Sequence, residues 1–199
     1  MKIVCVQGSS GSGKSYLNNK FNKLKNFVSY DSDDVSSACF FEEYDGSKET
    51  KTFWNKFSKR YEKKWKELYD KAETQNKEVF IICGTQSLPS FITEQDVLWC
   101  WIKITDYPAA YKRRINRDFE KVCENRKKIH KYIKNETHHN IMTLVNHGLM
   151  INTEFPIYSR WLEIEKYLIS LKKEVNKKLG REHWKIKTND ELYDMINNL

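Results

Sequence analysis

A glycine-rich segment near the start of the chain restricts the fold more than any other feature of the sequence. Residues 8–15 read GSSGSGKS and fit the pattern G-x-x-x-x-G-K-[ST]. The apolar run at residues 3–7 (IVCVQ) predicts a buried strand in front of this segment. Leu17, Phe21 and Leu24 recur at helical spacing behind it. The segment is therefore predicted to be the turn of a strand–turn–helix unit, in which consecutive backbone N–H groups face one concavity and bind an anion.

The rest of the chain alternates continuous apolar runs with amphipathic segments. Further strands are expected at residues 27–31, 79–84, 97–104 and 183–187. Helices are expected at residues 52–77 and 160–179, and a last helix is expected after the capping-box sequence at 188–191. A further helix is expected to start near residue 108, with basic helical segments continuing to residue 134. The polar turn at 31–41 is expected to open a short helix. This alternation predicts an α/β fold with three αβα layers and a mainly parallel sheet of about five strands. A length of 199 residues favours one domain over residues 1–199.

In a parallel sheet of this kind, ligands bind at the carboxyl ends of the strands. The positions expected at those ends are Gly8, Asp31, Gly84 and Thr105. The aromatic stripe within residues 52–77 is interpreted as core rather than as a cofactor site. Trp99 and Trp101 lie two residues apart on one face of an expected strand and are likewise interpreted as core rather than as base-stacking platforms.

Charge and composition restrict the partners and the compartment. The chain carries a formal net charge of +8 and has a pI near 9.1, which suits a polyanionic partner, either a nucleic acid or a phosphate-rich small molecule. An AT-rich coding genome would also enrich lysine, so charge alone does not choose between these partners. No apolar run reaches about 18 residues and the N-terminus lacks a signal sequence, so a soluble, cytoplasmic protein without a membrane partner is expected. None of these features predicts an oligomeric state.

The cysteines and histidines are interpreted as structural residues. The chain has five cysteines, an odd number, and no C-x-x-C pair, which indicates reduced thiols in a cytosolic protein. Cys123 together with His138, His139 and His147 matches no usual zinc spacing, so no zinc site is expected.

The residue types in the glycine-rich segment fit the phosphates of a nucleotide. Its glycines allow the backbone to bend around an anion, and the helix that starts near Lys14 adds the positive end of its dipole. Lys14 is expected to reach the β and γ phosphates, and Ser15 is expected to bind Mg²⁺. The residues expected to contact the nucleotide are Gly8, Ser9, Ser10, Gly11, Ser12, Gly13, Lys14, Ser15 and Tyr16.

With this motif the chain resembles the P-loop NTPases, and within them the small-molecule and nucleoside kinases of the uridine kinase and nicotinamide riboside kinase group. The acidic residues 31–34 (DSDD) follow the second expected strand, where these kinases and the 5′-hydroxyl polynucleotide kinases carry an Asp-Asp pair. Residues 113–118 (RRINRD) resemble the run that opens the phosphate-covering lid of nucleoside kinases. The short connection between the third and fourth expected strands is similar to that of the uridine kinase group, whereas polynucleotide kinases usually place a helix there.

The resemblance implies roles for the carboxylates. Asp33 is expected to bind the acceptor and to act as the base that deprotonates it. Asp34 is expected to hold Mg²⁺ together with Ser15, directly or through water. An ordinary turn followed by a helix N-cap remains the structural alternative for the whole acidic cluster, Asp31 included.

The resemblance also implies a helical lid over residues 112–150. Arg114 and Arg117, three residues apart, lie on one helix face and are expected to clamp the migrating phosphoryl group. Arg126 is a further lid candidate. Arg113 is expected to point elsewhere as an exposed surface residue. A solvated basic face is the structural alternative for these arginines.

One position departs from the pattern of those kinases. Many of them carry an acidic residue before a glycine at the end of the third strand, but this chain has Cys83 before Gly84. A carboxylate that would hold metal or substrate is therefore missing, so either the Asp33 and Asp34 pair takes over its role or turnover is impaired. Thr85 and Gln86 are expected to hydrogen-bond the acceptor instead.

The function that the resemblance implies is ATP-dependent transfer of the γ-phosphate to a nucleoside, a nucleotide or a nucleoside-like small molecule, with ATP and Mg²⁺ as cofactors. Two alternatives stay open. A polynucleotide 5′-hydroxyl kinase is favoured by the basic lid and helix surface and opposed by the short connection after Gly84. A nucleotide-binding switch or ATPase without a small acceptor is the other, although the chain lacks the N-K-x-D guanine signature.

Overall fold

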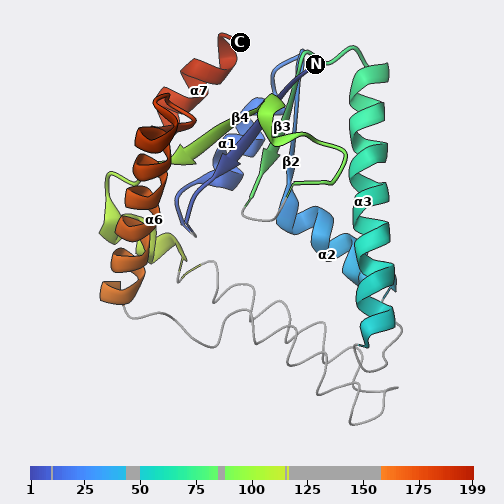
Figure 1. Ribbon diagram of the computed structural model, residues 1–199, viewed down its shortest axis with the longest axis horizontal. Helices are drawn as coiled ribbons and strands as arrows, with labels where there is room; N and C mark the ends of the chain where they lie inside the picture. The colour runs from blue at the N-terminus through green and yellow to red at the C-terminus, as the bar shows by residue number, and fades with distance from the viewer. Residues whose placement is uncertain (10, 44–49, 85–87, 115, 117–157) are drawn as a thin grey trace.

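Figure 1 shows the computed structural model of the chain, an α/β fold built on one parallel sheet. The structure describes residues 1–9, 11–43, 50–84, 88–114, 116 and 158–199. The strands are β1 (Lys2–Gln7), β2 (Phe27–Asp31), β3 (Val79–Cys83), β4 (Val97–Ile102) and β5 (Trp184–Lys187). The helical elements are α1 (Lys14–Phe21), α2 (Ser32–Glu43), α3 (Lys51–Thr74), the 3-10 turn η1 (Glu94–Asp96), a helix at 107–114, α6 (Tyr158–Leu179) and α7 (Asn189–Asn197).

The sheet has five strands, all parallel, in the order β2-β3-β1-β4-β5. On one side of β1, Val6 pairs with Cys83, which in turn pairs with Asp31 of β2. On the other side, Gln7 pairs with Trp101 of β4. Parallel strands end on the same edge, so the glycine-rich segment after Gln7 and the acidic cluster after β2 come close together. The expected α/β class with a parallel sheet is confirmed.

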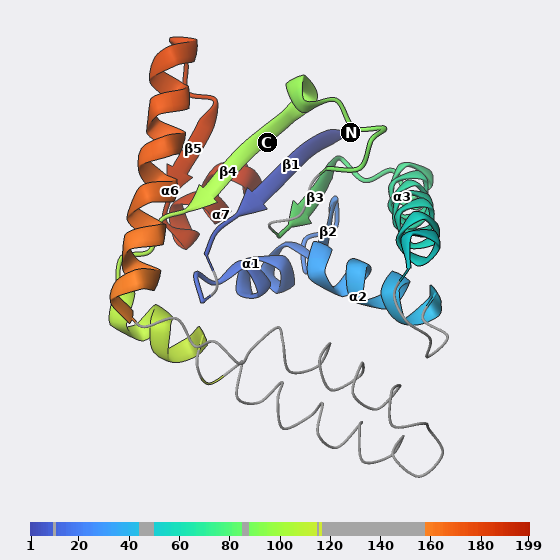
Figure 2. The same cartoon turned by 60° about the horizontal axis from the view of Figure 1, so that its bottom comes forward.

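Two hydrophobic clusters cover the two faces of the sheet, an arrangement compatible with three αβα layers. On one face, α1 and α7 contribute Leu17, Phe21, Leu192 and Ile196 to a cluster with residues of β1, β3 and β4. On the other face, α2 and α3 pack their apolar residues, among them the fully buried Trp65, against the opposite side of the same strands. α6 packs beside β5 at the far edge from α3 (Figure 2). Trp99 is 8% exposed and Trp101 is 3% exposed, so their interpretation as core is confirmed.

Two elements, α3 and β4, end two or three residues earlier in the structure than the sequence predicts. α3 ends at Thr74 rather than at residue 77, because Asn76 takes a left-handed conformation with φ of 53° and Lys77 N–H donates to the Ala72 carbonyl at 3.0 Å. β4 ends at Ile102 rather than at residue 104, where the chain turns toward the helix at 107–114. The predicted capping box at the start of α7 is confirmed, with Thr188 and Glu191 bonded reciprocally.

The cysteines of the described ranges are buried free thiols, as expected: Cys5, Cys39, Cys83 and Cys100. Burial raises the pKa of the Cys5 and Cys83 thiols to about 12. The expected absence of a zinc site concerns Cys123 and the three histidines at 138, 139 and 147, which lie outside the described residues. Among the helices that the structure describes, none combines the length and the apolar character needed to cross a bilayer.

Candidate functional site

The glycine-rich loop leaves β1 at the carboxyl edge of the sheet and turns back into α1. Ser12 N–H donates to the Ser9 carbonyl at 3.1 Å and closes the turn. Gly11 has a φ of +86°, and a Cβ added there would lie 2.2 Å from the backbone carbonyl oxygen of Ala110. No side chain fits at this position, because the helix at 107–114 packs its backbone directly against the loop. The loop conformation therefore depends both on a local glycine and on an element about a hundred residues away.

The Lys14 ammonium lies inside this loop. Its Nζ donates to the Gly8 carbonyl at 2.5 Å and to the Ser9 carbonyl at 3.2 Å. Lys14 is also the first residue of α1, where the free N–H groups and the positive end of the helix dipole favour an anion. The loop thus concentrates positive potential at one edge of the sheet, as the sequence pattern predicted. Tyr16, two residues further along α1, is 54% exposed.

Two side chains from distant elements hydrogen-bond to the loop carbonyls. Asn189, the first residue of α7, donates from Nδ2 to the Ser12 carbonyl at 2.9 Å. The Arg113 guanidinium donates to the Gly11 carbonyl at 3.3 and 3.4 Å from two of its nitrogens. The prediction that Arg113 points away from the site is wrong, although the side chain is exposed as expected. Its contact arises because the helix at 107–114 packs against the loop through Ala110.

Arg114, the predicted phosphoryl clamp, also lies beside the loop. Its Cβ is 3.3 Å from the position that a Cβ on Gly11 would take. The structure therefore brings both Arg113 and Arg114 to the glycine-rich loop. The other predicted lid arginines, Arg117 and Arg126, lie outside the described residues, as do Ser10, Thr85 and Gln86.

A third distant contact comes from α6. The Ser9 hydroxyl donates to the carboxylate of Glu165, which is fully buried. The other oxygen of this carboxylate accepts a hydrogen bond from the Trp101 indole at 3.3 Å. Sequence reasoning missed Glu165 and Asn189, because both lie in ordinary amphipathic helices and nothing in their local sequence indicates contact with the loop.

The acidic cluster divides into one half-buried carboxylate and two exposed ones. Asp31 Oδ2 lies 3.4 Å from the Ser15 hydroxyl, which donates to it, and Asp31 Oδ1 accepts the Asp33 N–H at 3.0 Å. Asp33 and Asp34 are exposed in the first turn of α2. Burial raises the pKa of the Asp31 carboxyl, with the neighbouring carboxylates acting in the same direction. The carboxylate that contacts the Ser15 hydroxyl is thus Asp31, while Asp34, predicted to hold Mg²⁺ together with Ser15, is exposed.

The signal that singles out Asp31 is its position as the last residue of β2. There it pairs with Cys83, at the position where many of the kinases that the sequence resembles carry an acid. Cys83 itself is fully buried, hydrogen-bonds to the Ser29 hydroxyl at 3.5 Å and has a pKa raised to about 12 by burial. It is therefore a core thiol and not a metal ligand. The Asp31 carboxylate lies one strand over from the position of the missing acid.

The oxygen donors beside the loop fit Mg²⁺ bound together with phosphates. A hydroxyl and a carboxylate, Ser15 and Asp31, are the hard oxygen ligands that this metal prefers. Within the described ranges, no group of three or more His, Cys, Asp or Glu side chains is placed to hold a metal by itself. Mg²⁺ usually takes one or two protein ligands and completes its shell with water and substrate phosphates, so two donors beside the glycine-rich loop would be sufficient.

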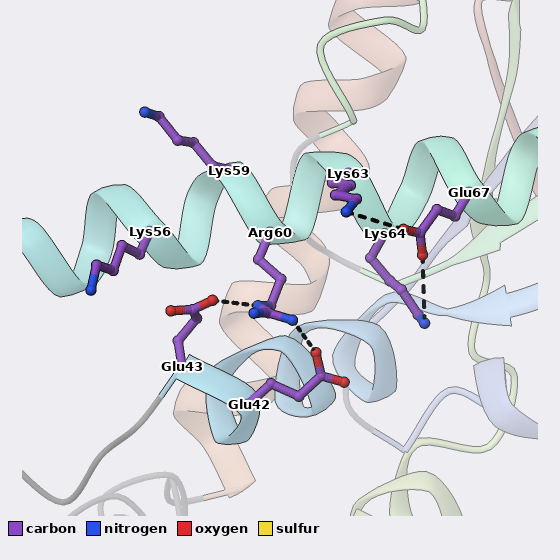
Figure 3. A pocket seen from close by; sticks show the side chains of 8 residues that line it. All are labelled: Glu42, Glu43, Lys56, Lys59, Arg60, Lys63, Lys64 and Glu67. Carbon is purple, nitrogen blue, oxygen red and sulfur yellow. Dashed lines mark hydrogen bonds and ion pairs between the residues drawn. The ribbon is translucent and has the colours of Figure 1, made fainter.

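A charged groove lies between α2 and α3, at the end of α2 remote from the acidic cluster (Figure 3). Its volume is about 460 Å³, and it is lined by Glu42, Glu43, Lys56, Lys59, Arg60, Lys63, Lys64 and Glu67. Arg60 bonds to both Glu42 and Glu43 across the two helices. With five cations, three carboxylates and no apolar lining residue, the groove suits an anionic ligand and not an uncharged one.

Comparison with known proteins adds no relative to this picture: no family model matches the chain, and no curated protein does.

Proposed function

We propose that this chain is an ATP-dependent phosphotransferase that moves the γ-phosphate to a nucleoside, a nucleotide or a nucleoside-like small molecule. The observation that carries the proposal is the position of the Lys14 ammonium. It donates to the Gly8 and Ser9 carbonyls of the glycine-rich loop, at the start of α1 and next in sequence to a serine whose hydroxyl contacts the Asp31 carboxylate. An anion-binding loop, a cation and a pair of hard oxygen ligands converging on one strand edge are the parts that phosphoryl transfer requires.

The loop residues would hold the donor nucleotide. The N–H groups of the loop and of the first turn of α1 would bind the phosphate oxygens, and Lys14 would neutralise the β and γ phosphates. Ser15 and Asp31 would hold Mg²⁺, which supplies neutralisation of the developing phosphate charge. Asp34, exposed in the next turn, would reach the metal through water. Arg114, beside Gly11, would place a further positive charge near the transferred group.

Asp33 is the residue that we assign as base toward the acceptor. It is exposed at the start of α2, and its N–H donates to the Asp31 carboxylate, which also accepts the Ser15 hydroxyl at the start of α1. An exposed carboxylate next to the site can orient an acceptor hydroxyl and take its proton as the bond to phosphorus forms. Phosphoryl transfer depends mainly on such positioning and on charge neutralisation.

The test is transfer of labelled γ-phosphate from Mg·ATP to a panel of nucleosides and nucleotides, with a 5′-hydroxyl oligonucleotide assayed in parallel. Lys14→Ala should lose nucleotide binding or turnover, while Lys23→Ala, at an exposed lysine just beyond α1, should leave both unchanged. Asp33→Asn should lower kcat, because it removes the proposed base. Parental transfer rates in both Lys14→Ala and Asp33→Asn would refute the proposal. Hydrolysis of ATP without transfer to any acceptor would support a switch or ATPase instead.

A second candidate, a polynucleotide 5′-hydroxyl kinase, is favoured by the charged groove of Figure 3. Glu42, at one end of this groove, lies nine residues beyond Asp33 on α2, which corresponds to about 13 Å along the helix. A single-stranded nucleic acid with its 5′ end at Asp33 would therefore need to extend by a few nucleotides to bring backbone phosphates to the lysines of the groove. Cations that neutralise phosphates without reading bases are typical of such binding.

Charge reversal in the groove separates the two candidates. The double variant Lys56→Glu/Lys59→Glu should raise the KM for an oligonucleotide acceptor and weaken its dependence on salt, because it removes phosphate contacts. Lys71→Glu reverses an exposed lysine on the same helix outside the groove and serves as the control. An oligonucleotide KM that is equal in all three proteins would remove the support that the groove lends to this candidate.

A further inference from the structure

The buried carboxylate of Glu165 contacts both the glycine-rich loop and the strand beside it. One oxygen accepts the Ser9 hydroxyl and the other accepts the Trp101 indole N–H at 3.3 Å. Trp101 pairs in register with Gln7, the last residue before the loop. Glu165 therefore lies at the junction of α6, β4 and the loop, although it is 156 residues away from Ser9 along the chain.

A carboxylate at this position is unfavourable for the packing of α6 itself. Glu165 is 0% exposed, and burying a charge costs much free energy unless the charge is paired. Both of its donors are neutral. Lys172, two turns further along α6, places its ammonium over the ring of Trp101 at 3.7 Å and over that of Trp184 at 4.6 Å. The Lys172 ammonium also attracts the Glu165 carboxylate electrostatically, but within the described ranges no ion pair joins the two, so the direct contacts of Glu165 are hydrogen bonds to the loop and to the strand.

The residue that Glu165 holds is central to the loop. The Ser9 carbonyl accepts the Ser12 N–H at 3.1 Å, which closes the turn, and the Lys14 ammonium at 3.2 Å. A change in the orientation of Ser9 therefore moves both the turn and the cation inside it. A hydrogen bond that fixes the Ser9 side chain also limits the orientations open to its backbone.

We infer that Glu165 is a positioning residue, which keeps Ser9 and the turn around it in the conformation that binds phosphate. The ligand in this inference rests on the proposed function, whereas the loop contact does not. The hydrogen bond is the part that acts, because a negative charge beside a triphosphate would by itself weaken binding. An electrostatic role and a positioning role therefore predict opposite effects when the carboxylate is neutralised or removed.

Four variants and one control separate these roles. Glu165→Ala removes both acceptors and the charge. Glu165→Gln removes the charge but keeps both contacts, because its oxygen can accept the Trp101 indole N–H while its NH2 group donates to the Ser9 hydroxyl oxygen. Ser9→Ala removes the donor, and Ser9→Ala/Glu165→Ala completes a double-mutant cycle. Glu163→Ala changes an exposed glutamate on the same helix and is the control. Each protein is measured for its affinity for Mg·ATP, for amide hydrogen exchange of a peptide spanning residues 8–16 without nucleotide, and for its Tm.

Glu165→Ala and Ser9→Ala are each expected to weaken Mg·ATP binding about tenfold or more, because a hydrogen bond to a charged group is lost. The double variant is expected to be no weaker than either single one, since both break the same bond. Glu165→Gln is expected to stay within about threefold of the parent, and exchange of the 8–16 peptide is expected to rise in Glu165→Ala but not in Glu163→Ala.

Tighter binding in both Glu165 variants would overturn the inference in favour of an electrostatic role. A lower Tm with unchanged affinity and unchanged loop exchange would overturn it in favour of a purely structural role. If the parent protein does not bind Mg·ATP, the proposed function fails, and the exchange data alone still decide whether Glu165 positions the loop.

Discussion

Replacing Gly84 with alanine would test the packing that places the acidic cluster beside the loop. Gly84 follows β3, has a φ of +154° and donates its N–H to the Val6 carbonyl at 3.0 Å. A Cβ on Gly84 would lie 1.7 Å from Ser32 Oγ and 2.9 Å from Ser32 Cβ. Ser32 begins α2 and stands between Asp31 and Asp33. An alanine at residue 84 must therefore push the start of α2, and the carboxylates on both sides of Ser32, away from the sheet.

The size of the effect follows from two costs. Overpacking a filled site costs about 1–3 kcal/mol, because neighbouring atoms must move out of their optimal positions. A positive φ in a residue that carries a Cβ adds about 1–2 kcal/mol. Gly84→Ala should therefore lower the free energy of unfolding by about 2–5 kcal/mol. At about 2–4 °C per kcal/mol for a chain of this size, the Tm should fall by about 4–20 °C.

The assay is urea unfolding followed by circular dichroism, with Ser32→Ala as the rescuing change. The Ser32 hydroxyl is buried and has no hydrogen-bond partner among the described residues, so Ser32→Ala alone should leave stability unchanged or slightly raised. In Gly84→Ala/Ser32→Ala the contact at 1.7 Å disappears and about 1–3 kcal/mol should return. Gly180 has a φ of +61°, and a Cβ added there would have no heavy atom within 4 Å. Gly180→Ala therefore measures the cost of a positive φ without any overpacking. If Gly84→Ala costs no more than Gly180→Ala, or if Ser32→Ala rescues nothing, the packing argument is wrong.

Three further predictions concern the site, a helix cap and the thiols. Asp31→Asn should raise the Tm at neutral pH, because burial raises the pKa of the Asp31 carboxyl and so makes its ionised form unfavourable in the folded protein. That gain should shrink as the pH falls from the raised pKa of the folded protein toward the ordinary value of 3.8, and it should vanish below 3.8, where the carboxyl is protonated in both states. Thermal unfolding from about pH 3 to about pH 8 measures the gain in Tm, and a gain that grows on acidification would contradict the prediction. Thr188→Ala should lower the free energy of unfolding in urea by about 1 kcal/mol, because it removes the side-chain half of the capping box with Glu191, and unchanged stability would show that the cap contributes nothing. Cys5 and Cys83 should react with a thiol reagent at mildly alkaline pH only after unfolding, because burial raises the pKa of both thiols to about 12; reaction of the native protein at the rate of a free thiol would refute their burial.

Hydrophobic patterning predicted the strands and the long helices α3 and α6, and it was less reliable at their ends. The continuous apolar run of β3 reflects a strand that is buried along its whole length, and the stripe of α3 reflects a helix that covers one face of the sheet. The end of α3 was placed three residues too late because the left-handed conformation of Asn76 depends on the hydrogen bonds of that particular turn. Periodicity measures which side of an element is apolar and does not report the backbone angle at its last residue.

The acidic cluster shows that the local sequence could not predict which aspartate contacts Ser15. Asp31, Asp33 and Asp34 are chemically equivalent within a four-residue stretch, and the resemblance to kinases assigned roles only to the last two. The structure distinguishes them by environment, because Asp31 ends β2 beside Cys83 while the other two lie in the exposed first turn of α2. Which carboxylate contacts Ser15 depends on where β2 stops, and that boundary is set by pairing with β3.

The sequence alone predicted where the glycine-rich loop lies, since the motif consists of consecutive residues between β1 and α1, with positive φ at Gly11 and Gly13 and a helix that begins at Lys14. Only the tertiary structure decided what surrounds that loop. Arg113, Glu165 and Asn189 reach it from 102, 156 and 177 residues away, through the order of strands in the sheet and the packing of the helices on its faces. Contacts at such separations arise from the arrangement of whole elements in space, and no pattern in neighbouring residues encodes them.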